Sequence, residues 1–181
     1  MTVDHADEYI YLGSPFSATG CITTDVKEHA TLKQKHVNKF HIFCGKNQSM
    51  PFSYKKTVFE AVLTAKLLYG CESWFTENVK AIDKQYISAM KSLLGVRKQI
   101  SNEVVLTELG AEDLRDRIHK SRKNFIKSKL SDPDEPLSIV YRLCERNNTK
   151  GYRMLQHALH SPCSATERRI QTIRDSSQTK L

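Results

Sequence analysis

Four side chains near the C-terminal end of the sequence have the chemistry of zinc ligands. Cys144 is followed by His157, His160 and Cys163, and the last three are spaced three residues apart. Thiolate sulfur and imidazole nitrogen are ligands that Zn²⁺ prefers. The spacing matches no common zinc module and no Cys-x-x-Cys pair accompanies it, so ordinary thiols and exposed imidazoles are the simpler interpretation. We predict no metal site, with zinc as the alternative hypothesis.

Asp132 and Asp134 are a second pair of side chains that a divalent cation would accept. Pro133 separates them and Pro136 follows in a polar stretch, which is typical of a solvated turn. The sequence contains no glycine-rich phosphate loop, no Gly-x-Ser-x-Gly and no His-Glu-x-x-His motif. We therefore predict no catalytic residues and no enzyme activity for this chain by itself.

The composition is that of a small, basic chain with little core material. The 181 residues are 39% hydrophobic and carry a net charge of +8, which allows one full-sized domain or two small ones. No segment approaches the roughly 18 consecutive apolar residues of a membrane span, and the acidic N-terminal segment is unlike a signal peptide. Five scattered cysteines favour reduced thiols. We expect an intracellular protein, nuclear or cytoplasmic, with no membrane partner.

The positive charge is concentrated in two segments. Residues 21–56 contain seven lysines against Asp25 and Glu28, for a net charge of +5. Residues 111–130 have seven basic and three acidic side chains, for a net charge of +4. Nucleic acid is the natural intracellular partner for such segments. The alternative is that these residues form solvated helix faces with no ligand.

The N-terminal part has the clearest strand pattern. Tyr9-Ile10-Tyr11-Leu12 is followed by the turn residues Gly13-Ser14-Pro15. This strand either pairs with the stretch 15–22 as a hairpin or joins a sheet that this chain lacks, because an isolated hairpin is marginally stable in water.

The rest of the sequence predicts a mainly α fold, a helical bundle preceded by the short strand or hairpin. A first helix begins with Thr24 as its cap and has an apolar stripe of Val26, Ala30, Val37, Phe40 and Cys44. Lys33 falls inside this stripe, where it either snorkels to the edge or marks a ligand. Further helices are expected at 53–69, 76–94, 101–109, 112–130, 136–144 and 152–160, before a disordered end at 176–181.

Three of these helices have patterns that predict their burial. The helix at 53–69 is apolar almost all round, so we expect it to be the buried centre of the bundle. The helix at 76–94 has a narrow stripe of Val79, Ile82, Tyr86, Met90 and Leu93. The helix at 112–130 has a thin seam of Leu114, Ile118 and Phe125 among basic residues.

Three segments, in order, resemble the region that follows the catalytic palm in reverse transcriptases of non-LTR (LINE-type) retrotransposons. The segment 7–14, Asp-Glu-Tyr-Ile-Tyr-Leu-Gly-Ser, is similar to the primer-grip strand. The segment 67–74, Leu-Leu-Tyr-Gly-Cys-Glu-Ser-Trp, resembles the signature at the end of the second thumb helix. The segment 105–110, Val-Leu-Thr-Glu-Leu-Gly, looks like the connector after the thumb. The resemblance covers roughly residues 7–140.

The resemblance implies an organisation for the whole chain. Residues 1–22 would be a primer-grip-like segment, 23–96 a three-helix thumb-like bundle, 97–131 basic connector helices and 132–181 a C-terminal helical segment. The Tyr-x-Asp-Asp motif that holds the catalytic Mg²⁺ ions of the parent polymerase is missing. The chain would then be a fragment of an RNA-directed DNA polymerase that binds template-primer nucleic acid without synthesis and has no cofactor of its own.

The same comparison implies partners and binding residues. The partners would be RNA or an RNA:DNA duplex, and the polypeptide of the missing palm and fingers. Tyr11, Leu12 and Gly13 match the primer grip, where Gly13 would allow close backbone approach. Charge and helical phase, rather than the resemblance, add basic residues that suit phosphate contacts: Lys27, Lys35, Lys39, Lys55, Lys56, Arg97 and Lys98.

An alternative function follows from the same features. A strand with an unpaired edge and a thin core both favour association with other polypeptides. The chain would then be a helical protein-interaction or self-association module derived from such an element.

Overall fold

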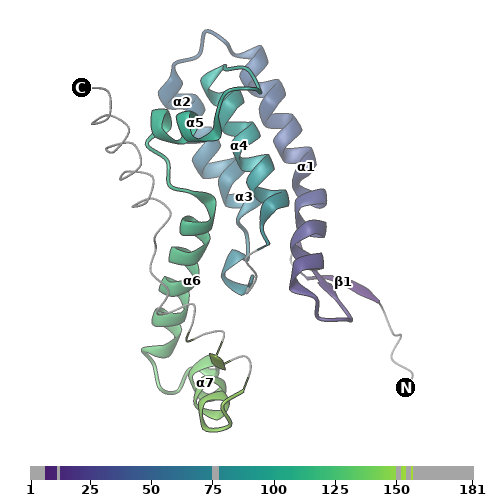
Figure 1. Ribbon diagram of the computed structural model, residues 1–181, viewed down its shortest axis with the longest axis vertical. Helices are drawn as coiled ribbons and strands as arrows, with labels where there is room; N and C mark the ends of the chain where they lie inside the picture. The colour runs from purple at the N-terminus through teal and green to yellow at the C-terminus, as the bar shows by residue number, and fades with distance from the viewer. Residues whose placement is uncertain (1–6, 12, 75–77, 150–151, 154–155, 157–181) are drawn as a thin grey trace, which may run out of the picture. The chain divides into compact units, whose positions relative to one another are not determined.

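The computed structural model is mainly helical and begins with a two-stranded antiparallel hairpin, which confirms the predicted fold class (Figure 1). It describes residues 7–11, 13–74, 78–149, 152, 153 and 156. The elements are β1 (Glu8–Tyr11), β2 (Ser14–Ser17), α1 (Ile22–Lys46), α2 (Phe52–Val58), the π-helix η1 (Phe59–Thr64), α3 (Ala65–Leu67), the 3₁₀ turn η2 (Cys71–Ser73), α4 (Lys80–Leu94), α5 (Asn102–Leu109), α6 (Leu114–Leu130) and α7 (Pro136–Arg146). The expected helix at 152–160 and the expected disordered end at 176–181 lie largely or wholly outside the described residues.

The chain divides into two compact units. Unit 1 comprises residues 1–70 and 76–111, and unit 2 comprises residues 71–75 and 112–181. The primer-grip-like segment and most of the thumb-like segment at 23–96 therefore belong to unit 1. Residues 71–75 of the thumb-like segment belong to unit 2, and the predicted connector at 97–131 is divided between the two units.

The N-terminal strand finds its partner within the chain. β1 pairs with β2, so that Tyr9 lies opposite Phe16 and Ile10 opposite Pro15. The hairpin packs against α1 through β2, and the backbone N–H of Ser17 donates to Asp25 Oδ1 at 3.0 Å. Of the two alternatives left by the sequence, the hairpin is the one observed.

The first helix has the core stripe that its periodicity predicts. The five predicted residues are all buried, while Lys35 and Lys39 are exposed. The prediction that Thr24 caps this helix is wrong. The carbonyl of Cys21 accepts from the N–H groups of Thr24 and Asp25, so Cys21 is the cap and Thr24 lies in the first turn. The helix α1 therefore begins three residues earlier than the side-chain pattern indicates.

The second predicted helix is continuous in the chain but irregular in its middle. α2, η1 and α3 follow one another without a break, and η1 is a π-helix. Phe59, Leu63 and Leu67 are buried, but the opposite side of this segment is solvent-exposed, so the prediction of burial all round is wrong. The physical reason is that, among the described residues, no other element covers this side, where Ala61, Val62 and Ala65 are exposed.

The most buried helix of unit 1 is α4, which runs beside α1 (Figure 1). All five residues of its predicted stripe are buried, which confirms that pattern. Gln85 ties the two helices together, because its Nε2 donates to the Ala30 carbonyl at 2.7 Å and to Gln34 Oε1 at 2.8 Å.

An aromatic cluster joins three elements in the core of unit 1. The Phe59 ring lies 5.7 Å from the Phe40 ring on α1 and 5.5 Å from the Tyr86 ring on α4, measured between centroids. Such tilted pairs add to the stabilisation that comes from burial. The cluster fixes the start of η1 against both long helices.

The short helix α5 agrees with its predicted bounds. Ser101 caps it by accepting a hydrogen bond from the Glu103 N–H at 3.3 Å, and the helix ends before Gly110. Its residues Val105, Leu106 and Leu109 are buried.

In unit 2, η2 packs on α6. Ser121 Oγ donates to Glu72 Oε1 at 3.0 Å, and the guanidinium of buried Arg122 donates to the Trp74 carbonyl. Leu114 and Ile118 form the predicted seam, but Phe125 is 42% exposed and Ile126 is buried instead. The prediction of Phe125 as a seam residue is wrong because the position following it in the helix faces the core.

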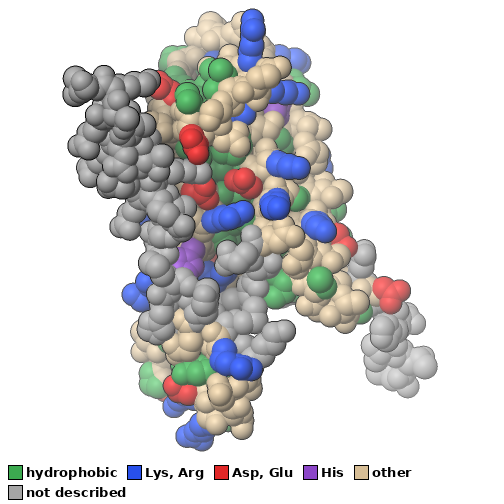
Figure 2. All heavy atoms as spheres, in the orientation of Figure 1, with side chains coloured by type: hydrophobic (Ala, Val, Ile, Leu, Met, Phe, Trp, Pro, Cys, Tyr) green, Lys and Arg blue, Asp and Glu red, His purple; other side chains and the backbone are tan. Residues whose placement is uncertain are grey.

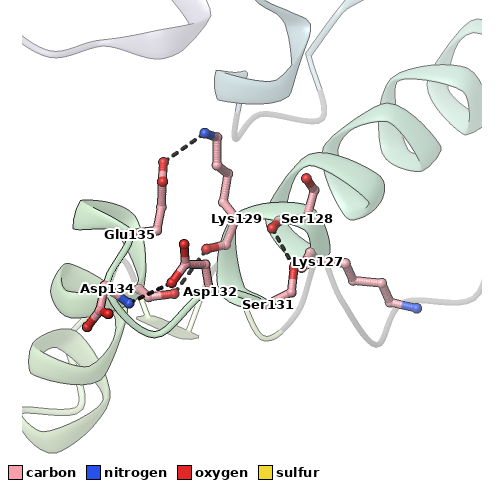
Figure 3. A network of polar contacts seen from close by, with 8 residues as sticks. Lys127, Ser128, Lys129, Ser131, Asp132, Asp134 and Glu135 are labelled. Atoms are coloured by element: carbon pink, nitrogen blue, oxygen red, sulfur yellow. Dashed lines mark hydrogen bonds and ion pairs between the residues drawn. The ribbon is translucent and has the colours of Figure 1, made fainter.

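The connection from α6 to α7 is a compact polar turn (Figure 3). Asp132 Oδ1 accepts from the Asp134 N–H at 2.9 Å, which confirms these aspartates as turn residues. Lys129 Nζ lies 2.7 Å from Glu135 Oε1, and Ser138 Oγ donates to the Lys129 carbonyl at 3.0 Å. Pro136 is the first residue of α7, as predicted.

Candidate nucleic-acid interface

The predicted lysines of α1 lie on its solvent-exposed surface. Lys27, Lys35 and Lys39 are exposed and, among the described residues, form no ion pair. Figure 2 shows that Lys and Arg side chains also gather over the helices of unit 1 on the face turned to the viewer. Unpaired surface cations of this kind are available to a polyanion.

A groove separates α1 from the segment of η1 and α3. Its cavity volume is about 460 Å³. The residues that line it are Lys33, His36, Ala61, Val62, Ala65, Lys66 and Tyr69. None of them is acidic. We call this feature the basic groove.

The groove exists because small side chains face outward from an irregular helix. Ala61 and Ala65 leave room where larger residues would fill it, and η1 is the π-helical part of the wall. π-Helical turns are rare and occur frequently at functional sites. Val62 and Tyr69 flank the alanines and are 49% and 46% exposed, so the apolar wall is open to solvent.

Lys33 links the groove to the hairpin. Its Nζ donates to the Gly13 carbonyl at 3.2 Å while its side chain also lines the groove. This geometry accounts for a lysine inside the apolar stripe, because the aliphatic stem lies in the stripe and the ammonium reaches a polar edge. The predicted residue Gly13 is thereby brought to the predicted basic helix.

The lining of the groove contains two lysines, Lys33 and Lys66, and no acidic side chain. Burial lowers the pKa of Lys33, and the charges of Lys35 and Lys66 lower it further. Burial and the neighbouring charges of Lys66, Lys35, Lys33 and Lys39 lower the pKa of His36. In both cases burial disfavours the charged form most and the neighbouring lysines disfavour it further, whereas a bound anion would favour it.

The remaining predicted basic residues lie elsewhere in unit 1. Lys55 and Lys56 belong to α2, and Lys55 Nζ donates to the Gln48 carbonyl at 3.1 Å. Arg97 and Lys98 are exposed in the loop between α4 and α5, where the Lys98 carbonyl accepts from Lys91 Nζ at 2.8 Å. None of these four lines the basic groove.

Of the other two predicted primer-grip residues, the structure describes only the backbone of Tyr11 and nothing of Leu12. Tyr11 is the last residue of β1, and its side chain is outside the described part of the structure. Leu12 lies outside the described residues altogether. Their assignment to primer binding stays a prediction.

The candidate zinc ligands are also untested. Cys144 is a half-buried free thiol on α7, whereas His157, His160 and Cys163 lie outside the described residues. Within the described ranges, no group of three potential metal ligands comes together. None of the described helices has the length and hydrophobicity that a bilayer span needs.

The sequence did not predict three of the groove residues as binding residues: His36, Lys66 and Tyr69. The available signal was the spacing of Ala61, Ala65 and Tyr69, which repeats every four residues and places small side chains along one helix face. The helix predicted at 53–69 is apolar on almost all sides, so this spacing did not stand out as a separate face. The sequence predicted Tyr69 only as an apolar residue of a buried helix and as part of the segment that carries the resemblance.

Comparison with known proteins adds nothing to this site. No protein family, curated protein or solved structure matches the chain.

Proposed function

We propose that this chain is the thumb and connector region of a non-LTR retrotransposon reverse transcriptase, and that it binds RNA or RNA:DNA duplex without synthesising DNA itself. The observation that supports this most is the set of exposed lysines on α1, unpaired among the described residues, next to a groove that has basic and no acidic lining. The segments 7–14 and 67–74, which carry the resemblance, both contribute to this region: Gly13 contacts Lys33, and Tyr69 lines the groove.

The physical basis of such binding is electrostatic. Lysines that contact phosphates release condensed counterions from the nucleic acid, so affinity falls steeply as salt rises. Contacts to phosphate and sugar fix the protein on the duplex without reading its sequence. A helix with exposed lysines on successive turns, as in α1, suits this mode of binding.

A titration of the full chain by fluorescence anisotropy tests the proposal. Labelled RNA duplex, RNA:DNA hybrid and DNA duplex of unrelated sequences are each titrated at several salt concentrations. We expect binding to RNA-containing duplexes that is independent of sequence and weakens linearly in a plot of log affinity against log salt. The absence of binding to every duplex at low salt would reject the proposal.

The hairpin supports a second candidate function, association with another polypeptide. Tyr9, Ile10 and Phe16 are largely exposed, and within the described residues β1 pairs with β2 alone. The partner would be the palm and fingers polypeptide or a second copy of this chain. Size-exclusion chromatography with light scattering separates the candidates, because self-association without nucleic-acid affinity would favour this second function.

A further inference from the structure

The basic groove combines two surface chemistries. One wall is apolar and consists of Ala61, Ala65, Val62 and the ring of Tyr69. On the other side Lys33 and Lys66 supply the positive charge, and His36 adds an imidazole. A simple inorganic anion would use only the basic side of this groove. A ligand that fills it needs a flat apolar part and an anionic part joined together.

The size of the groove limits the ligand to one such unit. Its volume of about 460 Å³ lies within the usual range for sites that hold a single small molecule. The bases of a duplex are stacked and paired, so they cannot lay a face against a protein wall. An unpaired nucleotide can, and aromatic side chains are the usual surface on which it stacks.

The surroundings favour a nucleotide within a strand over a free one. Lys35 and Lys39 are exposed on the helix that forms the basic side of the groove. Their charges reach His36 inside it, because both contribute to the lowered pKa of that imidazole. Positive charge that extends past the groove matches successive phosphates better than the single phosphate of a free nucleotide.

We infer that the basic groove binds one unpaired nucleotide of a polynucleotide strand, with its base against Tyr69 and Val62 and its phosphate at Lys33, His36 and Lys66. The inference rests on the proposed nucleic-acid function and adds a substrate class, a duplex that continues into a single strand. The lysines of α1 bind the adjoining phosphates, and the groove distinguishes a junction from a blunt end.

Fluorescence of 2-aminopurine tests the inference directly. The fluorescent base is placed as the first unpaired nucleotide of an RNA overhang, and the full chain is titrated into it. A blunt duplex with the same paired sequence is titrated in parallel by anisotropy. We expect quenching of the 2-aminopurine and an affinity for the overhanging duplex about fivefold or more above that for the blunt duplex.

Matched tyrosine variants assign the effect to the groove. Tyr69→Ala should abolish the quenching and bring the affinity for the overhanging duplex down to that for the blunt duplex. Tyr54→Ala is the control, because Tyr54 is 66% exposed on α2 and does not line the groove. Tyr69→Phe should keep the preference, since stacking needs the ring and not the hydroxyl.

Each contrary result has its own meaning. If the wild-type chain binds neither duplex, the proposed function fails and the inference falls with it. If the chain binds both duplexes equally, or if Tyr69→Ala leaves the quenching intact, the inference is overturned while the proposed function stands. A free nucleoside monophosphate that displaces the overhang at micromolar concentration would also overturn it, because the groove would then be a mononucleotide site.

Discussion

His29 Nε2 donates a hydrogen bond to the carbonyl of Leu67 at 3.0 Å, and both residues are buried in the core of unit 1. The bond joins α1 to the end of α3, two residues before Tyr69. Because a carbonyl oxygen only accepts, the Nε2 atom carries the proton. Burial lowers the pKa of His29 to about 4, so the imidazole is neutral at pH 7.

This histidine predicts a loss of stability in mild acid. The pKa of His29 is about 4 in the folded chain and near its ordinary value of 6.5 in the unfolded chain. Below pH 6.5 the unfolded state takes up a proton that the folded state excludes, so the free energy of unfolding falls until about pH 4. The expected loss is roughly 3 kcal/mol, measured by urea unfolding at a series of pH values.

His29→Gln is the control for that measurement. The glutamine amide can donate to the Leu67 carbonyl but does not titrate. The variant should therefore unfold with a much weaker dependence on pH between 6.5 and 4. An unchanged pH dependence would show that other groups carry the effect.

Gly70→Ala should destabilise unit 1. Gly70 has a φ of +73°, and an added Cβ would meet Ser14 Oγ on β2 at 3.1 Å. The left-handed conformation alone costs about 1–2 kcal/mol for an alanine. Gly20→Ala is the matched control, since Gly20 has a φ of +63° and no atom within 4 Å of an added Cβ. We expect thermal unfolding to show a larger loss for Gly70→Ala, and equal losses would contradict the contact with the hairpin.

Phe59→Ala should be among the most damaging core substitutions. The ring is 1% exposed and contacts both Phe40 and Tyr86, so its removal leaves a cavity between α1, η1 and α4. Such truncations cost about 3–5 kcal/mol. Phe52→Ala, at a 46% exposed position of α2, should cost much less in the same chemical unfolding experiment. Similar losses in the two variants would place the core elsewhere.

Reversing two charges on α1 should weaken nucleic-acid binding. In the double variant Lys35→Glu and Lys39→Glu, loss of two phosphate contacts should flatten the salt slope by about two. The double variant Lys80→Glu and Lys84→Glu on exposed positions of α4 changes the net charge equally. Anisotropy titrations should show a large loss for the first and a small one for the second. Equal losses would mean that overall charge, and not the α1 surface, drives binding.

His36 should make binding to an overhang dependent on pH. Four lysines act on it, Lys33, Lys35 and Lys39 from α1 and Lys66 from α3, and together with burial they keep its pKa below the ordinary value. A phosphate in the groove favours the protonated imidazole, so affinity should rise as the pH falls from 7.5 to 5.5. His36→Gln should flatten this rise. If the variant keeps the full rise, His36 does not contact the phosphate.

Several features were predictable because they depend on local patterns. The stripes of α1 and α4 follow from helical periodicity, and the cap of α5 follows from the short range of its hydrogen bond, from Ser101 to Glu103. The turn at Asp132 depends on a contact two residues away. In each case the residues that decide the structure lie within one or two turns of each other in the sequence.

The errors occurred where distant residues decide the outcome. The exposure of Ala61 and Ala65 depends on which helices cover the segment 52–67, and Ile126 replaces Phe125 in the seam through packing within unit 2. The hydrophobicity of a side chain indicates that it can be buried. It does not indicate which element of the fold will cover it.

The sequence by itself determined a mainly helical, basic chain with an N-terminal strand and lysines on the outer face of α1. Only the tertiary structure decided that β2 pairs with β1, that Lys33 reaches Gly13, and that a groove opens between α1 and the irregular helix beside it. The reason is that charge and periodicity are properties of consecutive residues. A groove is the space that two helices leave between them, and its lining is shared between residues about 30 positions apart.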